Sequence, residues 1–134
     1  MTDLGVNTHL GIDRALCGTV TARSEGTATV VLDTTAVMGA DRRGLVHGGF
    51  VFGAADYAAM VAVNDPFVVL GAAETRFLAP VAVGQQVRLE AVVAESRKRK
   101  RIVEVTGRVD EREVFTGRFT TFVLDQHVLG PPAS

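Results

Sequence analysis

The sequence predicts an α+β fold in which an antiparallel sheet packs on one long helix, and three observations carry this prediction. Residues 49–63 are apolar on every side of a helix, with a single acid among them. Segments rich in β-branched residues, separated by glycine-containing or polar turns, lie before and after this helix, which is typical of strands. No repeat or low-complexity linker divides the sequence. Runs of strands around one helix indicate the α+β class.

The first expected strands form a hairpin that follows a short leading segment. Residues 1–15 are predicted to be irregular or to form a short helix. Residues 16–35 are rich in Thr and Val around Ser24-Glu25-Gly26, and β-branched runs on either side of a glycine-containing turn are a hairpin signal. Residues 34–46 then form a charged loop that leads into the helix.

The helix, residues 49–63, is followed by the helix breaker Asn64-Asp65-Pro66. A helix that is apolar on every side is buried on every side. One sheet can cover only part of this surface, so we expect a second copy of the chain to cover the rest. The apolar residues run around its whole circumference: Phe50, Val51, Phe52, Ala54, Ala55, Ala58, Ala59, Met60, Val61, Ala62 and Val63.

The chain after the helix is predicted to form strands joined by short turns. Residues 67–78 read as one long extended segment, and residues 86–95 and 102–109 alternate apolar with polar side chains. Residues 114–124 form a last strand after a polar turn. The simplest packing is a curved antiparallel sheet wrapped around the helix.

Length and composition indicate one globular domain, residues 1–134, with a core of about residues 16–124. The net charge of −1 argues against general nucleic-acid binding. The single cysteine, Cys17, fits a reducing compartment. The sequence shows neither a signal-peptide pattern nor an apolar run of membrane-spanning length, so we expect a cytoplasmic protein that does not bind membranes.

Asp56 is the single acid within the apolar helix. An ionised carboxylate in such surroundings costs on the order of several kcal/mol unless it is paired, hydrated or neutralised. One interpretation is a structural ion pair with an arginine such as Arg76. The other is a carboxylate that is kept in an apolar place because it takes part in chemistry.

The helix is preceded by His47-Gly48-Gly49. These glycines can serve simply to make a tight entry into the helix. A helix N-terminus, however, has unpaired N–H groups and about half a positive charge, and glycine lets a ligand oxygen approach those groups closely. The same amides can therefore polarise a carbonyl, as in an oxyanion hole.

The spacing of these groups predicts a dimer. Gly48 and Asp56 are eight residues apart, which is about 12 Å along a helix. A base and an oxyanion donor that act on one carbonyl must both lie within about 3 Å of it or of its attacking water. One helix cannot supply both, whereas two antiparallel helices related by a two-fold axis can, and they form two shared sites.

Residues 41–64, DRRGLVHGGFVFGAADYAAMVAVN, resemble the signature of hotdog-fold acyl-CoA thioesterases of the phenylacetate-pathway and HGG type. In that family a histidine and two glycines open the central helix, and an acid lies nine positions after the histidine, as Asp56 does here. A polar residue, commonly asparagine, lies six positions before the histidine, and Asp41 occupies that position in this sequence. The resemblance implies that the Gly48 amide polarises the thioester carbonyl and that Asp56 of the partner chain is the general base or the nucleophile. It also implies that His47 orients the loop or contacts the thioester.

Residues 101–122, RIVEVTGRVDEREVFTGRFTTF, with ETRFLAPVAVGQQV before them, are similar to the acyl-CoA-sensing hotdog domain of a bacterial fatty-acid-synthesis repressor. That branch binds malonyl-CoA without hydrolysing it and lacks the acid in its helix. A non-catalytic acyl-CoA-binding protein is therefore the alternative function, and Asp56 favours catalysis. Hydration or dehydration of an acyl-CoA double bond, a third reaction of this fold, usually needs a histidine paired with the acid.

Residues 97–101, RKRKR, hold five of the fourteen basic residues. They are expected to form a solvated hairpin tip or strand edge, and a nucleic-acid patch or import signal is the other general interpretation of such a run. The resemblance places the coenzyme A nucleotide near this hairpin. Arg99 and Arg101 are therefore candidate phosphate contacts.

The remaining predicted site residues line the substrate pocket. Phe52, Met60 and Phe77 are expected to form an apolar acyl pocket, and Gly49 and Asp41 complete the substrate-binding set. The three histidines and Cys17 lack metal-ligand spacing, so we expect no metal and no cofactor other than the coenzyme A of the substrate. The sequence thus predicts an acyl-CoA thioesterase that is a homodimer or a homotetramer.

Overall fold

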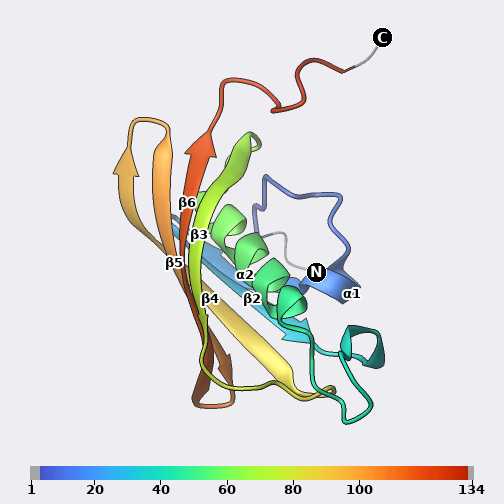
Figure 1. Cartoon of the computed structure of the whole chain (residues 1–134). Coiled ribbons are helices and arrows are strands. Elements are labelled where there is room, and N and C mark those ends of the chain that lie inside the picture. Colours follow the sequence, from blue (N-terminus) through green and yellow to red (C-terminus); the bar gives the residue numbers. More distant parts are fainter. Residues whose placement is uncertain (1–3, 133–134) are drawn as a thin grey trace.

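Six antiparallel strands form one sheet that curves around the helix α2, Gly48–Val63, in the computed structural model (Figure 1). The structure describes residues 4–132. The strand order across the sheet is β1-β2-β4-β5-β6-β3, so β1 and β3 are its edges. The strands are β1 Thr19–Ser24, β2 Thr27–Asp33, β3 Val68–Phe77, β4 Gln86–Arg97, β5 Lys100–Val109 and β6 Arg112–Val123. Two short helices, α1 Arg14–Cys17 and the 3-10 helix η1 Ala36–Met38, precede α2.

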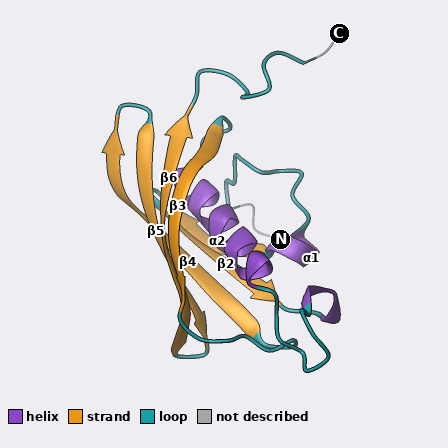
Figure 2. Ribbon diagram, viewed as in Figure 1, coloured by secondary structure: helices purple, strands orange, loops and turns teal. Residues whose placement is uncertain are grey.

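The α+β class and the curved antiparallel sheet are confirmed, with small shifts in the element boundaries (Figure 2). Helix α2 begins at Gly48, one residue before the predicted start. Strands β4 and β5 are longer than predicted, because the ladder continues to the pair Arg97 and Lys100. The basic run therefore forms the end of the β4–β5 hairpin, as expected.

The core lies between α2 and the concave face of the sheet. The largest fully buried side chains include Leu32, Leu89, Phe115 and Phe119 from the strands and Met60 from the helix. Gly117 on β6 leaves room for these rings, since a Cβ there would lie 2.6 Å from Cε2 of Phe119. Close packing of this kind makes each position sensitive to small changes in volume.

The N-terminal segment covers the side of α2 that faces away from the sheet (Figure 1). The amide of Asn7 donates to Oδ1 of Asn64 over 2.7 Å, and Nδ2 of Asn64 donates to the carbonyl of Gly5 over 3.0 Å. Val6 and Ile12 pack against the core. A part of the helix surface that the sequence assigned to a second copy is therefore covered by the chain itself.

A second stripe of α2 is less covered, and we call it the open face of α2. It consists of Gly49, Phe52, Gly53, Asp56 and Val63, which are exposed or half-buried and recur at helical spacing.

Within the described chain, the edge strand β3 has a ladder partner, β6, on one side alone. Between residues 4 and 132, no helix combines the length and the hydropathy that a membrane crossing requires.

Candidate active site at the start of helix α2

The chain entering α2 is held by backbone hydrogen bonds from two directions. Val46 N–H donates to the carbonyl of Val81 over 2.8 Å, and His47 N–H donates to the carbonyl of Met38 over 2.9 Å. Upstream, Oδ1 of Asp41 accepts from the amides of Arg43 and Leu45 at 2.9 and 3.2 Å. These bonds fix the direction from which the chain enters the helix, and they give Asp41 the role of stabilising the turn before it.

The first amides of α2 are available to a ligand. His47 is the N-cap residue, its side chain makes no capping bond, and its carbonyl accepts from Phe50 N–H over 3.1 Å. The amides of Gly48 and Gly49 have no acceptor among residues 4–132, as is usual for the first turn of a helix. The His47 ring lies against Gly49, with Nε2 3.1 Å from where a Cβ would stand. Two free N–H groups at the positive end of a helix can bind a carbonyl or anionic oxygen.

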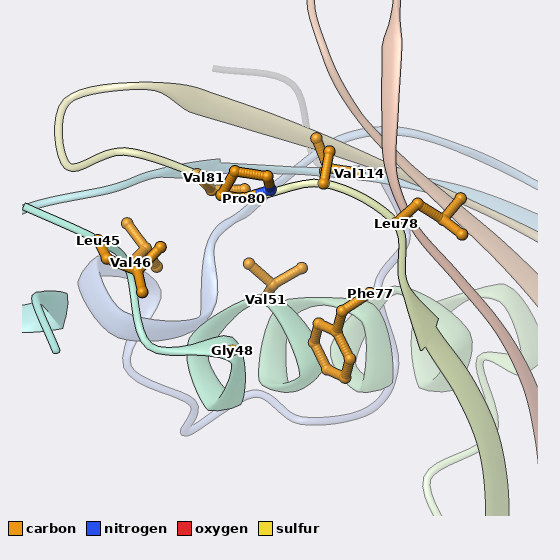
Figure 3. Close-up of a pocket in the computed structure, with 10 residues that line it drawn as sticks. Leu45, Val46, Gly48, Val51, Phe77, Leu78, Pro80, Val81 and Val114 are labelled. Carbon is orange, nitrogen blue, oxygen red and sulfur yellow. The ribbon is translucent and has the colours of Figure 1, made fainter.

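An apolar cavity of about 340 Å³ opens beside these amides (Figure 3). The loop before the helix, the helix itself and the chain after β3 form its walls. Phe77, predicted to line a pocket, lies on this wall. The lining residues are Leu45, Val46, Gly48, Val51, Phe77, Leu78, Ala79, Pro80, Val81 and Val114.

Asp56 is a half-buried acid with one carboxylate oxygen that has no partner on the part of the chain that the structure describes. Its Oδ1 is fully buried and makes no hydrogen bond there, and burial raises the pKa of the Asp56 carboxyl to about 6. Cys17 on α1 lies close enough to Asp56 for the charge of Asp56 to act on its thiol. Burial raises the pKa of the Cys17 thiol most, and the charges of Asp13 and Asp56 raise it further. A buried polar atom without a partner is uncommon and requires an explanation.

The interpretation of Asp56 as half of a structural ion pair with Arg76 is wrong. Arg76 lies on β3 and lines a groove on the opposite face of the sheet, together with Glu74, Glu104 and Arg118. Side chains alternate between the faces of a strand, so Phe77 points to the helix side and Arg76 points away from it. The Oδ1 atom of Asp56 is therefore buried without a positively charged partner among residues 4–132.

Phe52 and Met60 do not line the cavity beside Gly48. The Phe52 ring packs on Phe119 with 5.6 Å between ring centroids, and Met60 is fully buried in the core. Phe52 belongs to the open face of α2 and so borders Asp56 instead. Sequence reasoning missed the other walls, Leu78, Pro80 and Val114, because they come from separate segments and carry no signal beyond being apolar.

The two arginines of the predicted phosphate contact lie at the end of the β4–β5 hairpin. Arg99 pairs with Asp125, and Nη1 of Arg101 donates to the carbonyls of Lys98 and Lys100. Arg101 is opposite Thr121 on β6, which is in turn opposite Leu70 near the start of β3. The hairpin end therefore lies near the C-terminal end of α2, away from Gly48 of its own chain (Figure 1).

A curved antiparallel sheet around one helix, with a His-Gly-Gly entry and an acid on the helix, defines a hotdog-fold protein. Residues 43–116, more than half of the chain, match the family model described as the thioesterase superfamily. The chain belongs to this superfamily.

Two curated relatives match the chain over part of their own length. One is methylthioribose-1-phosphate isomerase of Aquifex aeolicus, 47% identical over 91% of this chain and 27% of that protein. Another is the transcription factor FapR of Shouchella clausii, 33% identical over 61% of this chain and 43% of that protein. The chain thus spans less than half the length of either relative.

Solved structures agree with the fold over nearly the whole chain. An uncharacterized protein of Pyrococcus horikoshii has a TM-score of 0.93 and 47% identity, and the match covers 96% of this chain and 99% of that one. PaaI of E. coli, from the phenylacetic acid degradation operon, has a TM-score of 0.77 and 25% identity over 85% of this chain and 84% of that one. Both resemblances named from the sequence, to PaaI-type thioesterases and to the repressor, are therefore confirmed.

Proposed function

We propose that this protein hydrolyses an acyl-CoA thioester at a site shared by two copies of the chain. The observation that carries the proposal is the half-buried Asp56 carboxyl, whose Oδ1 is buried without a hydrogen-bond partner among residues 4–132 and whose pKa is raised by burial to about 6. Groups held in this way cluster at sites of chemistry. A carboxylate with such a pKa is still largely ionised at neutral pH and is a stronger base than an ordinary aspartate.

The reaction uses the helix start and the acid in separate roles. The thioester carbonyl oxygen accepts hydrogen bonds from the Gly48 and Gly49 amides, which stabilise the negative charge that develops on it. Asp56 removes a proton from water while the water oxygen bonds to the carbonyl carbon. The C–S bond then breaks, and the coenzyme A thiolate leaves and takes up the proton. The products are the carboxylic acid and free coenzyme A.

The distance along α2 supports a site shared between chains. Gly48 and Asp56 of one helix are about 12 Å apart, too far to act on the same carbonyl. The open face of α2 carries both Gly49 and Asp56. An antiparallel partner helix on this face brings its own Gly48 close to Asp56, and two-fold symmetry creates a second, identical site.

The antiparallel arrangement of the two α2 helices also determines which chain's β4–β5 hairpin would contact coenzyme A. Arg99 and Arg101 lie near the C-terminal end of α2 in their own chain. In an antiparallel pair they lie near the start of the other chain's α2. The chain that supplies Asp56 therefore also supplies the cationic contacts to the coenzyme A phosphates, while the other chain supplies Gly48, Gly49 and His47.

Replacing Asp56 with asparagine tests the function. Asp56→Asn keeps the shape of the side chain but removes the base, so kcat/KM for the best acyl-CoA is expected to fall by about 10²–10⁴-fold. Release of free coenzyme A, followed with a thiol reagent, measures hydrolysis, and calorimetry measures binding. Glu111→Gln, at an exposed turn between β5 and β6, is the matched control and is expected to leave hydrolysis unchanged.

One alternative is a protein that binds acyl-CoA without turning it over, as the resemblance of residues 101–122 to the acyl-CoA-sensing domain of a repressor implies. If the wild type binds acyl-CoA tightly but releases no coenzyme A from any thioester of the panel, the sensing alternative is correct and the hydrolase is not. If the wild type hydrolyses the thioester and Asp56→Asn hydrolyses it equally fast, Asp56 is not the base.

A further inference from the structure

We propose that the Phe77 ring is the gate of the acyl pocket, and that the pocket accepts an uncharged acyl group whose length this ring limits. The inference rests on the proposed function, because it takes the thioester carbonyl to lie at the Gly48 amide. It adds a class of acyl group and a residue that determines specificity within that class.

The chemistry of the cavity wall selects the acyl group. Gly48 lines the 340 Å³ cavity, so an acyl chain whose carbonyl meets the Gly48 amide has this space directly beside it. The side chains that line the cavity are aliphatic or aromatic, from Leu45 and Val51 to Leu78 and Val114. A second carboxylate, as in a malonyl group, would be buried there without a charge partner, which is strongly unfavourable.

Phe77 forms a part of the cavity wall close to Gly48. It is the last residue of β3, and its side chain is 54% exposed although it is aromatic. Three of its ring atoms lie 3.1–3.6 Å from the position of a Cβ on Gly48. The ring is held edge-on against Phe115, with 5.2 Å between centroids. Figure 3 shows Phe77 beside α2, among the residues that line the cavity together with Gly48.

The size of the cavity sets an upper limit on the acyl chain. A water-sized group occupies about 30 Å³ in a liquid, so the cavity holds about ten such groups. We therefore expect the wild type to prefer an acyl chain of medium length. Removing the Phe77 ring extends the space, and replacing it with a larger ring reduces the space.

The experiment compares acyl chain lengths in three proteins. Butanoyl-, octanoyl- and dodecanoyl-CoA, with malonyl-CoA as the charged probe, are offered to the wild type, Phe77→Ala and Phe77→Trp. Relative to the wild type, the ratio of kcat/KM for dodecanoyl- over butanoyl-CoA is expected to rise at least about tenfold in Phe77→Ala and to fall in Phe77→Trp. Malonyl-CoA is expected to bind more weakly than octanoyl-CoA in all three.

Dissociation constants for the same ligands, measured in the Asp56→Asn background, keep the test independent of turnover. Val92→Ala, an apolar residue 51% exposed on β4, is the control and is expected to leave the length profile unchanged. An unchanged profile in both Phe77 variants, or malonyl-CoA binding as tight as octanoyl-CoA binding, overturns this inference and leaves the proposed hydrolysis intact. A wild type that binds with the predicted length profile but hydrolyses no thioester overturns the proposed function and supports the gate.

Discussion

At the scale of the single residue, the carboxylate of Asp56 that the proposed function requires is expected to lower the stability of the folded chain. Its folded pKa of about 6 lies above the ordinary value of 3.8, so the folded chain binds this proton more tightly than the unfolded chain does. The effect on stability is absent below the unfolded pKa, where both states are protonated. As the pH rises from about 4 to about 6, the folded state loses stability relative to the unfolded state, and the loss is complete above pH 6.

Asp56→Asn is therefore expected to stabilise the protein at pH 8. The difference in pKa corresponds to about 2–3 kcal/mol in the free energy of unfolding, enough to raise the melting temperature by at least a few degrees. At pH 4.5 most of this gain should disappear. Thermal unfolding of the wild type and the variant at both pH values measures it. An equal gain at both pH values would show that the carboxylate charge is not responsible.

At the scale of the element, the open face of α2 leaves room for another surface to pack closely against the helix. Apart from its two chain neighbours and the nearby backbone of α2 itself, no described atom lies within 4 Å of the Cβ position of Gly53. Glycine within a helix costs about 1 kcal/mol relative to alanine, and a single chain has no steric reason to bear this cost. A helix packed on this face would supply the reason.

Gly53→Arg is expected to prevent dimerisation and to abolish hydrolysis while the chain still folds, because the space around Gly53 is open within one chain. Light scattering coupled to size-exclusion chromatography measures the mass, and circular dichroism checks the fold. Ala94→Arg, on an exposed stretch of β4, is the control and should leave the dimer intact. A Gly53→Arg dimer with full activity would contradict the arrangement.

At the scale of the whole molecule, the proposed shared site predicts that two inactive variants complement each other. Proline is well tolerated at the first position of a helix and lacks the N–H, and the extended His47 backbone (ψ 129°) suits a following proline. Gly48→Pro therefore removes one amide donor. Its Cβ would approach the Phe77 ring to about 3.1 Å, so Gly48→Ala, which makes the same contact and keeps the N–H, is the control.

Mixed dimers of Asp56→Asn and Gly48→Pro chains contain one site with both groups intact and one site with neither. Random pairing gives half mixed dimers, so co-expression is expected to restore about a quarter of the wild-type activity. The rate of coenzyme A release from the co-expressed pair, compared with each variant alone, measures this recovery. No recovery, with mixed dimers verified by differential tags, would show that each chain holds a complete site.

The sequence alone determined the fold class, and it predicted the two most informative positions of the candidate site. Hydrophobic periodicity is local, so the all-apolar helix and the alternating strands could be recognised without the structure. Gly48 and Asp56 stood out because a glycine pair at a helix start and an acid in an apolar helix conflict with local preferences. The fixed rise of a helix then turned their separation into a prediction about quaternary structure.

The tertiary structure decided what surrounds these positions. Local pattern could not tell whether Asp56 meets Arg76, because that depends on which face of β3 each side chain occupies, and the structure places Arg76 on the far face. It also brings Phe77, Val114 and Leu45 to one cavity from three distant segments. Residues 4–17 pack against α2. Such contacts join residues far apart in the chain, and they are set by how the sheet curves around the helix.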